Sequence, residues 1–302
     1  MYSGSFALSV VLCRAGANQC TICIVANGNS IYCCGGYVIN DIFDVDIDAV
    51  NKNNTQIIGN TVSEEEAYRL YKILCFLGIA STLLLALFTK NYRLSMIPIL
   101  IMLVLNFYAH TFKKQLIVGN FMISLCAAFV FILMALYESG GNTANSANSL
   151  YIKSGITIAA IVYGLFAFLT TFLREIIKDI EDKEGDEQYN CKTIPIVFGT
   201  KIAKIVSIVL ILFLLVMLGS FAWFFPTLNM KMASYGIAIG FVLPLLVMLI
   251  LIVKATTNEH FHFISNAIKI FMLLGTLTLL YFYSGNGPYV FVQYVNFLKK
   301  LV

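Results

Sequence analysis

The chain has 302 residues, of which 59% are hydrophobic and only 12% are charged, and its mean hydropathy is +0.84. Such values lie far outside the range of soluble globular domains, so the composition excludes an ordinary soluble enzyme and indicates a protein in a lipid bilayer. The net charge is only +4, and we expect membrane lipids rather than nucleic acid as surrounding partners.

Apolar runs recur along the chain, and each is close to the roughly 20 residues that a helix needs to cross about 30 Å of hydrocarbon. Seven are uninterrupted: Ile73–Phe88, Leu94–His110, Gln115–Tyr137, Leu150–Leu173, Ile205–Phe225, Ala233–Val253 and Ser265–Tyr283. An eighth candidate, Cys20–Ile39, contains several polar residues. Lipid offers no partners to open backbone groups, so every crossing has to be helical. We therefore predict an all-α, polytopic membrane helical bundle of seven to nine transmembrane helices, forming one domain over residues 1–302.

An acidic stretch, NDIFDVDID, follows the eighth candidate crossing from Asn40 to Asp48. Asp41, Asp44 and Asp48 stand three and four residues apart, which on a helix puts their carboxylates on one face. Like charges along one face repel each other unless a cation neutralises them. Oxygen donors without sulfur or imidazole favour Mg²⁺ over zinc. The stretch therefore predicts half of a divalent-metal site.

A polar stretch from Asn51 to Tyr71 comes next. Ser63 and Glu66 within it have the spacing of a capping box, in which each side chain accepts the backbone N–H of the other. We expect a loop that leads into an interfacial helix, long enough to fold over a site.

A second acidic stretch, REIIKDIEDKEGD, runs from Arg174 to Asp186. Asp179, Asp182 and Asp186 repeat the spacing of the first set. Four predicted crossings, an even number, separate the two sets, so both should face the same side of the membrane. That side carries about twice as many Lys and Arg residues as the other, which predicts that it is cytoplasmic.

Two carboxylate sets on one membrane face predict a central cavity that opens to the cytoplasm and binds an anion through metal ions. Diphosphate fits best, because Mg²⁺ held by few carboxylates completes its shell with water and substrate phosphates. The remaining phosphate charge would be held by basic residues near the same face, namely Lys52, Lys113, Lys114, Arg174 and Lys178. The apolar remainder of the cavity suits a hydrocarbon tail.

The acidic stretches, together with YAHTFKK followed by GN and with the later KTIPIVFG, resemble the signature blocks of the UbiA superfamily of membrane prenyltransferases. The resemblance runs from about Gly35 to Ser284. Within the superfamily the chain is most similar to the branch that includes geranylgeranylglycerol-phosphate geranylgeranyltransferases. Residues 1–34 match least, and we expect a divergent or incomplete first helix there.

This resemblance implies that Mg²⁺ bridges both Asp motifs to a prenyl diphosphate donor and that a lipophilic acceptor attacks the allylic cation. The catalytic, metal-binding positions would be Asp41, Asp44, Asp48, Asp179, Asp182 and Asp186. The substrate-binding positions would be Asn40, Lys52, Tyr108, Lys113, Lys114, Arg174 and Lys178. The family follows its Asn-Arg or Asn-Lys pair with a proline, a second basic residue and another proline, whereas this chain reads NKNNTQIIG. Because the second basic residue is missing, Lys52 becomes the more important expected contact to the diphosphate.

The function expected on this basis is Mg²⁺-dependent transfer of a geranylgeranyl-like group to geranylgeranylglyceryl phosphate, in a bacterial cytoplasmic membrane with the site facing the cytoplasm. One alternative, by the same mechanism, is prenylation of an aromatic quinone precursor or a chlorophyllide-like acceptor. An alternative of another class is a cation transporter, since paired acidic clusters can form an ion path. Carboxylates at helix ends, rather than in the middle of spans, favour the enzyme.

Overall fold

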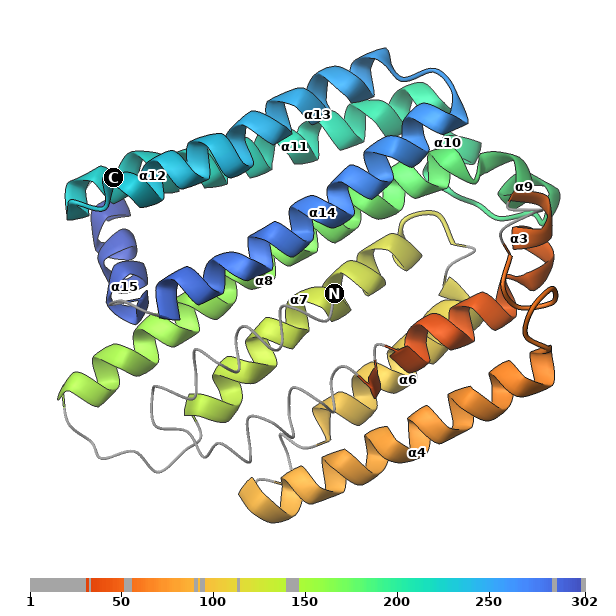
Figure 1. Ribbon diagram of the computed structural model, residues 1–302, viewed down its shortest axis with the longest axis horizontal. Helices are drawn as coiled ribbons and strands as arrows, with labels where there is room; N and C mark the ends of the chain where they lie inside the picture. The colour runs from red at the N-terminus through yellow and green to blue at the C-terminus, as the bar shows by residue number, and fades with distance from the viewer. Residues whose placement is uncertain are drawn as a thin grey trace.

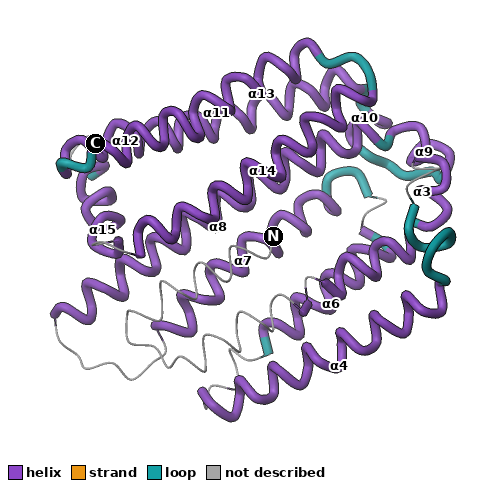
Figure 2. Tube along the Cα trace, viewed as in Figure 1, coloured by secondary structure: helices purple, strands orange, loops and turns teal. Residues whose placement is uncertain are grey.

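The computed structural model describes residues 31–32, 34–51, 56–89, 92, 96–112, 115–139, 147–283 and 287–299. Within these ranges the backbone is helical apart from turns and short loops, and it contains no strand (Figures 1 and 2). An isolated bridge joins Ile58 and Val62. The expected all-α fold is therefore confirmed for the described part of the chain.

The long described helices run roughly side by side, and short helices lie at both ends of the bundle (Figure 1). They are α3 (Val45–Asn51), α4 (Glu64–Thr89), α6 (Ile97–His110), α7 (Val118–Ser139), α8 (Ala147–Glu181), α9 (Lys183–Gln188), α10 (Ile194–Val197), α11 (Thr200–Phe224), α12 (Lys231–Ile237), α13 (Leu243–Lys254), α14 (Asn258–Tyr283) and α15 (Gly287–Leu298), with a 3₁₀ turn η2 (Phe225–Leu228) and a π-helical turn η3 (Ala238–Val242). Residues 34–43 are also helical and lead into α3.

Five helical stretches of the described chain are long and apolar enough to cross a bilayer: Glu64–Leu87, Ser154–Glu181, Thr200–Leu228, Lys231–Lys254 and Asn258–Leu279. The shorter apolar helices Ile97–His110 and Val118–Leu133 coincide with two further predicted crossings. Large apolar side chains face outward from α11, where Phe213, Val216 and Trp223 are 61%, 73% and 62% exposed. A surface of this kind is suited to hydrocarbon. The helices are therefore those of an integral membrane protein, and the number of crossings stays a prediction.

Two helices are longer than the sequence predicted. α4 is unbroken, so the expected interfacial helix and the crossing after it are one element. The capping box that starts it is confirmed, since the Ser63 N–H donates to Glu66 Oε2 at 3.0 Å and the Glu66 N–H donates to Ser63 Oγ at 3.3 Å. α8 continues beyond the expected end of its crossing because Ile176, Ile177 and Ile180 extend its buried face as far as the second Asp motif. The acidic stretch that follows Leu173 is therefore mostly helical.

A wide helical turn interrupts the regular geometry between α12 and α13. Pro244 lies in the first turn of α13 and has no N–H, so it cannot bond the Gly240 carbonyl four residues earlier, and its ring crowds that group. The π-helical turn η3 accommodates this defect. The helix nevertheless stays continuous from Lys231 to Lys254, and the predicted crossing keeps its length.

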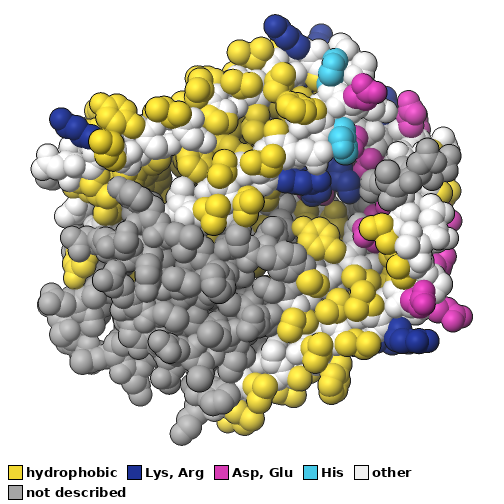
Figure 3. All heavy atoms as spheres, viewed as in Figure 1, with side chains coloured by type: hydrophobic (Ala, Val, Ile, Leu, Met, Phe, Trp, Pro, Cys, Tyr) yellow, Lys and Arg dark blue, Asp and Glu magenta, His cyan; other side chains and the backbone are white. Residues whose placement is uncertain are grey.

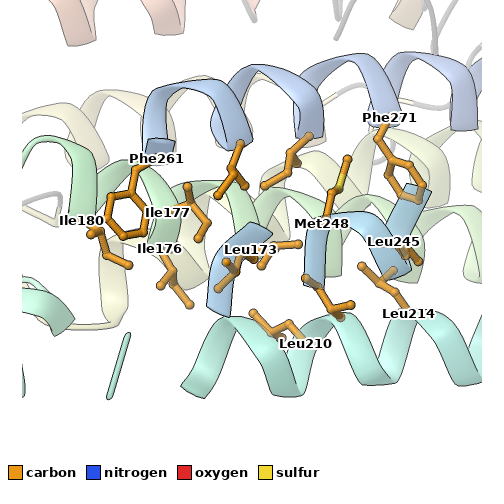
Figure 4. Packing of buried hydrophobic residues seen from close by; sticks show 14 of the residues in the cluster. Leu173, Ile176, Ile177, Ile180, Leu210, Leu214, Leu245, Met248, Phe261 and Phe271 are labelled. Atoms are coloured by element: carbon orange, nitrogen blue, oxygen red, sulfur yellow. The ribbon is translucent and has the colours of Figure 1, made fainter. Parts of the chain in front are cut away.

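The main apolar core surrounds α8, which packs against α7, α11, α14 and α15. Side chains from several helices meet in it, among them Leu173 of α8, Leu214 of α11, Leu245 of α13 and Phe261 of α14, and these four are almost fully buried (Figure 4). In a bilayer such contacts act through close packing rather than through exclusion of water. α8 is therefore firmly held where it delivers the second Asp motif.

Candidate active site

Each Asp motif lies where a helix is interrupted. Asp44 forms a turn between residues 34–43 and α3, and Asp182 forms a turn between α8 and α9. Backbone bonds from residue i to residue i−4 nevertheless continue across both turns. They join Asp44 to Asn40 at 3.0 Å, Asp48 to Asp44 at 2.7 Å, Asp182 to Lys178 at 2.8 Å and Asp186 to Asp182 at 3.1 Å. The spacing of three and four residues therefore still places the carboxylates of each set on one side.

The two interruptions meet at one end of the bundle, where α3 packs on α9 (Figure 1). Asn51, the last residue of α3, donates from Nδ2 to the Asp182 carbonyl oxygen at 3.2 Å and accepts the Gly185 N–H at Oδ1, at 2.9 Å. Charged side chains gather at this end, while most described side chains elsewhere on the visible face are hydrophobic (Figure 3). The prediction that both motifs face one side is confirmed. That this side is cytoplasmic stays a prediction.

In the first motif, the central carboxylate lies deepest. Asp44 is only 3% exposed and accepts a hydrogen bond at Oδ2 from Asn40 Nδ2 at 2.7 Å. Asp41 is exposed and Asp48 is half-buried. Asn40 therefore orients the buried carboxylate from the preceding helical turn.

In the second motif, one carboxylate has a partner on a neighbouring helix and another has a partner on its own helix. Asp179 Oδ2 accepts a hydrogen bond at 2.7 Å from Asn120 Nδ2 of α7. Asp182 Oδ2 lies 3.9 Å from Lys178 Nζ, one turn earlier on α8. Asp186 is 5% exposed. Burial of several carboxylates in a membrane protein is costly and is typical of a functional site.

Tyr108, Arg174 and Lys178 lie between the two motifs. Tyr108 donates its hydroxyl to Glu175 Oε2 at 3.5 Å, and Glu175 forms an ion pair with Arg174. Tyr108 interacts electrostatically with Asp44 of the first motif and Asp179 of the second. Lys178 likewise interacts with Asp44 and with Asp182. The structure thus brings two of the predicted cations and the predicted tyrosine to the junction of the motifs.

The donors at this junction fit a Mg²⁺ ion that is shared with a phosphate group. No three His, Cys, Asp or Glu side chains of the described residues are grouped closely enough to hold a metal ion alone. Mg²⁺, however, is usually held by one or two carboxylates plus substrate phosphates. Arg174 Nε is buried without a hydrogen-bond partner among the described residues. An unpaired buried donor costs about 1–3 kcal/mol, and an anion would pair it.

Three predicted substrate contacts, Lys52, Lys113 and Lys114, lie outside the described residues. Conversely, three contacting residues were not predicted: Asn51, Asn120 and Glu175. Asn120 stands out as a polar residue at the start of an apolar helix, and Glu175 lies within the second acidic stretch, so both had a signal in the sequence. The role of Asn51 depends on a contact across more than 130 residues, which no local pattern reveals.

An apolar cavity of about 260 Å³ lies nearer the other end of α8, with Tyr163, Phe166, Phe221 and Gly275 in its lining. Phe166 precedes Asp179 by 13 residues, which corresponds to roughly 20 Å along a helix. This cavity is therefore separate from the charged junction. Its lining suits hydrocarbon and not a phosphate group.

The fold and the site together define an integral membrane protein that has paired carboxylate motifs at one end of a helical bundle. The model of the UbiA prenyltransferase family matches residues 5–272. The digeranylgeranylglyceryl phosphate synthase of Methanothermobacter thermautotrophicus is 31% identical over 264 residues, which cover 83% of this chain and 80% of that protein. The chain belongs to the UbiA prenyltransferase family.

A second relative, the digeranylgeranylglyceryl phosphate synthase of Sulfurisphaera tokodaii, is 33% identical over 186 residues. The matched part spans 60% of this chain and only 60% of the length of that relative. Both organisms are archaeal, so these relatives lend no support to the expected bacterial membrane.

Solved structures share the fold. A UbiA homologue from Aeropyrum pernix K1 has a TM-score of 0.66 at 19% identity, covering 92% of this chain and 96% of its own. A digeranylgeranylglyceryl phosphate synthase has a TM-score of 0.63 at 24% identity, covering 95% and 93%. A UbiA homologue from Archaeoglobus fulgidus, bound to DMAPP and Mg²⁺, has a TM-score of 0.54 at 14% identity, covering 92% and 95%.

Proposed function

We propose that the chain transfers a geranylgeranyl-like group from a prenyl diphosphate to geranylgeranylglyceryl phosphate, releases diphosphate and requires Mg²⁺. The observation that carries this proposal is the meeting of two partly buried carboxylate motifs beside Arg174 and Lys178 at one end of an apolar bundle. Family membership supports prenyl transfer, and the named relatives support the glyceryl phosphate acceptor. The A. fulgidus homologue with DMAPP and Mg²⁺ supports the donor class and the metal.

In the reaction, the bond between C1 of the prenyl group and the diphosphate oxygen breaks, and C1 bonds to the acceptor hydroxyl oxygen. The proton of this hydroxyl leaves with the released diphosphate. Bound Mg²⁺ supplies positive charge that stabilises the leaving diphosphate. Arg174 and Lys178 hydrogen-bond phosphate oxygens, and the unpaired Arg174 Nε is a donor suited to this role. Buried walls, including Tyr108 at 7% exposure, exclude water that would otherwise capture the allylic cation.

The metal-binding set in this proposal comprises Asp41, Asp44, Asp48, Asp179, Asp182 and Asp186. The substrate-binding set comprises Asn40, Lys52, Tyr108, Lys113, Lys114, Arg174 and Lys178. We further propose that the site faces the cytoplasm and that residues 1–302 act as one membrane domain.

The test is a transfer assay in membranes with labelled geranylgeranyl diphosphate and Mg²⁺. Geranylgeranylglyceryl phosphate, 4-hydroxybenzoate and a naphthoate are offered in parallel. Product on the glyceryl phosphate alone supports the proposal. Product only on an aromatic acceptor would retain prenyl transfer and overturn the acceptor assignment. Absence of product with every acceptor, together with ion uptake into vesicles that lack prenyl diphosphate, would favour a transporter.

A further inference from the structure

The contact between Asn51 and α9 has the geometry of a helix cap supplied from another helix. The first N–H groups of any helix lack partners within it and need an external acceptor. In α9, Asp182 is the N-cap residue and Gly185 is the third helical residue. Asn51 Oδ1 accepts the Gly185 N–H at 2.9 Å, which is the bond that an N-cap side chain normally makes.

Asp182 does not cap its own helix. Aspartate is among the preferred N-cap residues, because its carboxylate readily accepts the N–H of the second or third helical residue. Here the Asp182 side chain makes no such bond, and its Oδ2 lies instead 3.9 Å from Lys178 Nζ. Asn51 occupies the position that the Asp182 carboxylate would otherwise take, and its Nδ2 also holds the Asp182 carbonyl oxygen at 3.2 Å.

Gly185 provides the space for this contact. A Cβ atom at position 185 would lie 2.5 Å from Asn51 Oδ1, 2.6 Å from Nδ2 and 2.7 Å from Cγ. These distances are shorter than real Cβ contacts, so any larger residue would displace the Asn51 amide. The contact therefore requires both residues, the amide of Asn51 and the missing side chain of Gly185.

We propose that Asn51 is a positioning residue that caps α9 from α3 and thereby keeps the Asp182 carboxylate directed into the active site. The inference rests on the proposed function, because it assigns Asp182 to the metal and diphosphate. It adds that the two Asp motifs are coupled through Asn51, whose side chain hydrogen-bonds to backbone atoms of Asp182 and Gly185. Without Asn51, the Asp182 carboxylate turns back to cap Gly185.

The experiment compares the full-length wild type with Asn51→Ala in two measurements. One is the half-saturating Mg²⁺ concentration for transfer. The other is the Mg²⁺ concentration that gives half of the maximal rise in the thermal unfolding midpoint of the purified protein in the presence of inorganic diphosphate. Both should increase about 10–100-fold, the usual cost of removing a residue that orients a metal ligand. An unchanged Mg²⁺ requirement in both measurements would overturn the proposal.

The matched control is Ser234→Ala. Ser234 Oγ donates to the Ala222 carbonyl oxygen at 2.6 Å, so this variant also removes one side chain to backbone bond between separate segments. The bond lies far along the bundle from the Asp motifs, and the Mg²⁺ requirement should stay at the wild-type value. A rise in Ser234→Ala equal to that in Asn51→Ala would mean that general destabilisation explains the effect, and would overturn the proposal.

Gly185→Ala gives a second test, because its expected effect on the Mg²⁺ requirement differs with and without the cap from Asn51. Alanine is the better helix former by about 1 kcal/mol, so without the cap this change should stabilise α9 and leave Mg²⁺ binding unaltered. With the cap, it displaces Asn51 and should raise the Mg²⁺ requirement as Asn51→Ala does. The double variant should then be no worse than either single one, because both remove the same interaction. Effects that multiply in the double variant would contradict the proposal. An unaltered Mg²⁺ requirement in Gly185→Ala would also contradict it, and this measurement does not depend on the folding of Asn51→Ala.

The two proposals fail in different ways. A wild type that transfers no prenyl group would refute the proposed function. A wild type that transfers normally, beside an Asn51→Ala variant with the same Mg²⁺ requirement, would refute only the role of Asn51.

Discussion

Asn120 of α7 donates a hydrogen bond from Nδ2 to Oδ2 of Asp179 on α8 at 2.7 Å. Asn120 is 6% exposed, so little water is available to replace this bond. The amide therefore fixes the orientation of the first carboxylate of the second motif. α7 contributes to the site in this way although it contains no acidic motif.

We expect Asn120→Ala to lower transfer by about 5–100-fold, because a buried carboxylate that loses its partner forfeits about 1–3 kcal/mol. The measurement is kcat/KM for the donor at saturating Mg²⁺. Ser220→Ala is the control, since the hydroxyls of Ser220 and Tyr294 share a hydrogen bond of 2.6 Å near the C-terminal end of α11, at the end of the bundle opposite to α3 and α9 (Figure 1). Equal losses in both variants would refute a specific role for Asn120.

The central carboxylate of each motif should be indispensable. Asp44→Asn and Asp182→Asn keep the size of the side chain and remove its charge, so transfer should fall by on the order of 100-fold or more. Asp46→Asn, on the exposed face of α3, is the control and should retain activity. The measurement is turnover per inserted protein in membranes. Near-normal turnover in either central variant would mean that the metal assignment is wrong.

Lys178 should act mainly in binding of the donor. Its ammonium lies near Asp182 and interacts with Asp44, so Lys178→Met removes positive charge from the junction of the motifs. We expect the KM for prenyl diphosphate to rise about 10-fold or more, the size of one lost charge-assisted hydrogen bond. Lys192→Gln, which changes an exposed residue, should leave the KM unaltered. An unchanged KM in Lys178→Met would remove this residue from the site.

Chelation of divalent ions should abolish transfer reversibly. The motifs offer oxygen donors, and no three acidic side chains of the described residues are grouped closely enough to hold an ion alone. This arrangement suits Mg²⁺ shared with phosphate oxygens and suits Ca²⁺ poorly, because Ca²⁺ takes six to eight ligands. Activity lost on treatment with EDTA should return with Mg²⁺ and much less with Ca²⁺. Full activity in EDTA would contradict the metal-dependent mechanism.

Gly275 should be required for packing of α14 against α8. A Cβ atom there would lie 2.4 Å and 2.6 Å from two ring atoms of Phe166, whose ring also contacts Phe271 at 5.6 Å between centroids. Gly275→Ala should therefore destabilise the protein by about 1–3 kcal/mol. Gly219→Ala on α11 meets no atom within 4 Å and should be neutral or mildly stabilising. Thermal unfolding in one detergent compares the two, and equal midpoints would contradict the packing argument.

Much of this architecture was predictable because an apolar run that spans a membrane can be recognised from a short stretch of sequence. Apolar runs located helices such as α11 and α14, and the Ser63 and Glu66 pair located the start of α4. The ends of helices were less predictable. α8 extends past its apolar run because Ile176, Ile177 and Ile180 find a core to pack against, and that core is assembled only in the fold.

The acidic residues of the site were predictable, because their regular spacing is visible in the sequence. The spacing of Asp44 and Asp182 within their motifs marked both as candidate ligands, and the structure places them at equivalent helix interruptions. The bonds that orient the carboxylates, from Asn120 and Asn51, join distant parts of the chain. Such partners depend on how helices pack, and one sequence carries no direct record of that.

The bond pattern of Asn51 also bears on how this protein can change during evolution. Because both hydrogen bonds of the amide go to main-chain atoms, at Asp182 and Gly185, replacements at Lys183 and Glu184 should leave them intact. Positions 51 and 185 cannot change independently, since a residue larger than glycine at 185 requires a side chain smaller than asparagine at 51. Among relatives we therefore expect these two positions to covary while the residues between Asp182 and Gly185 drift.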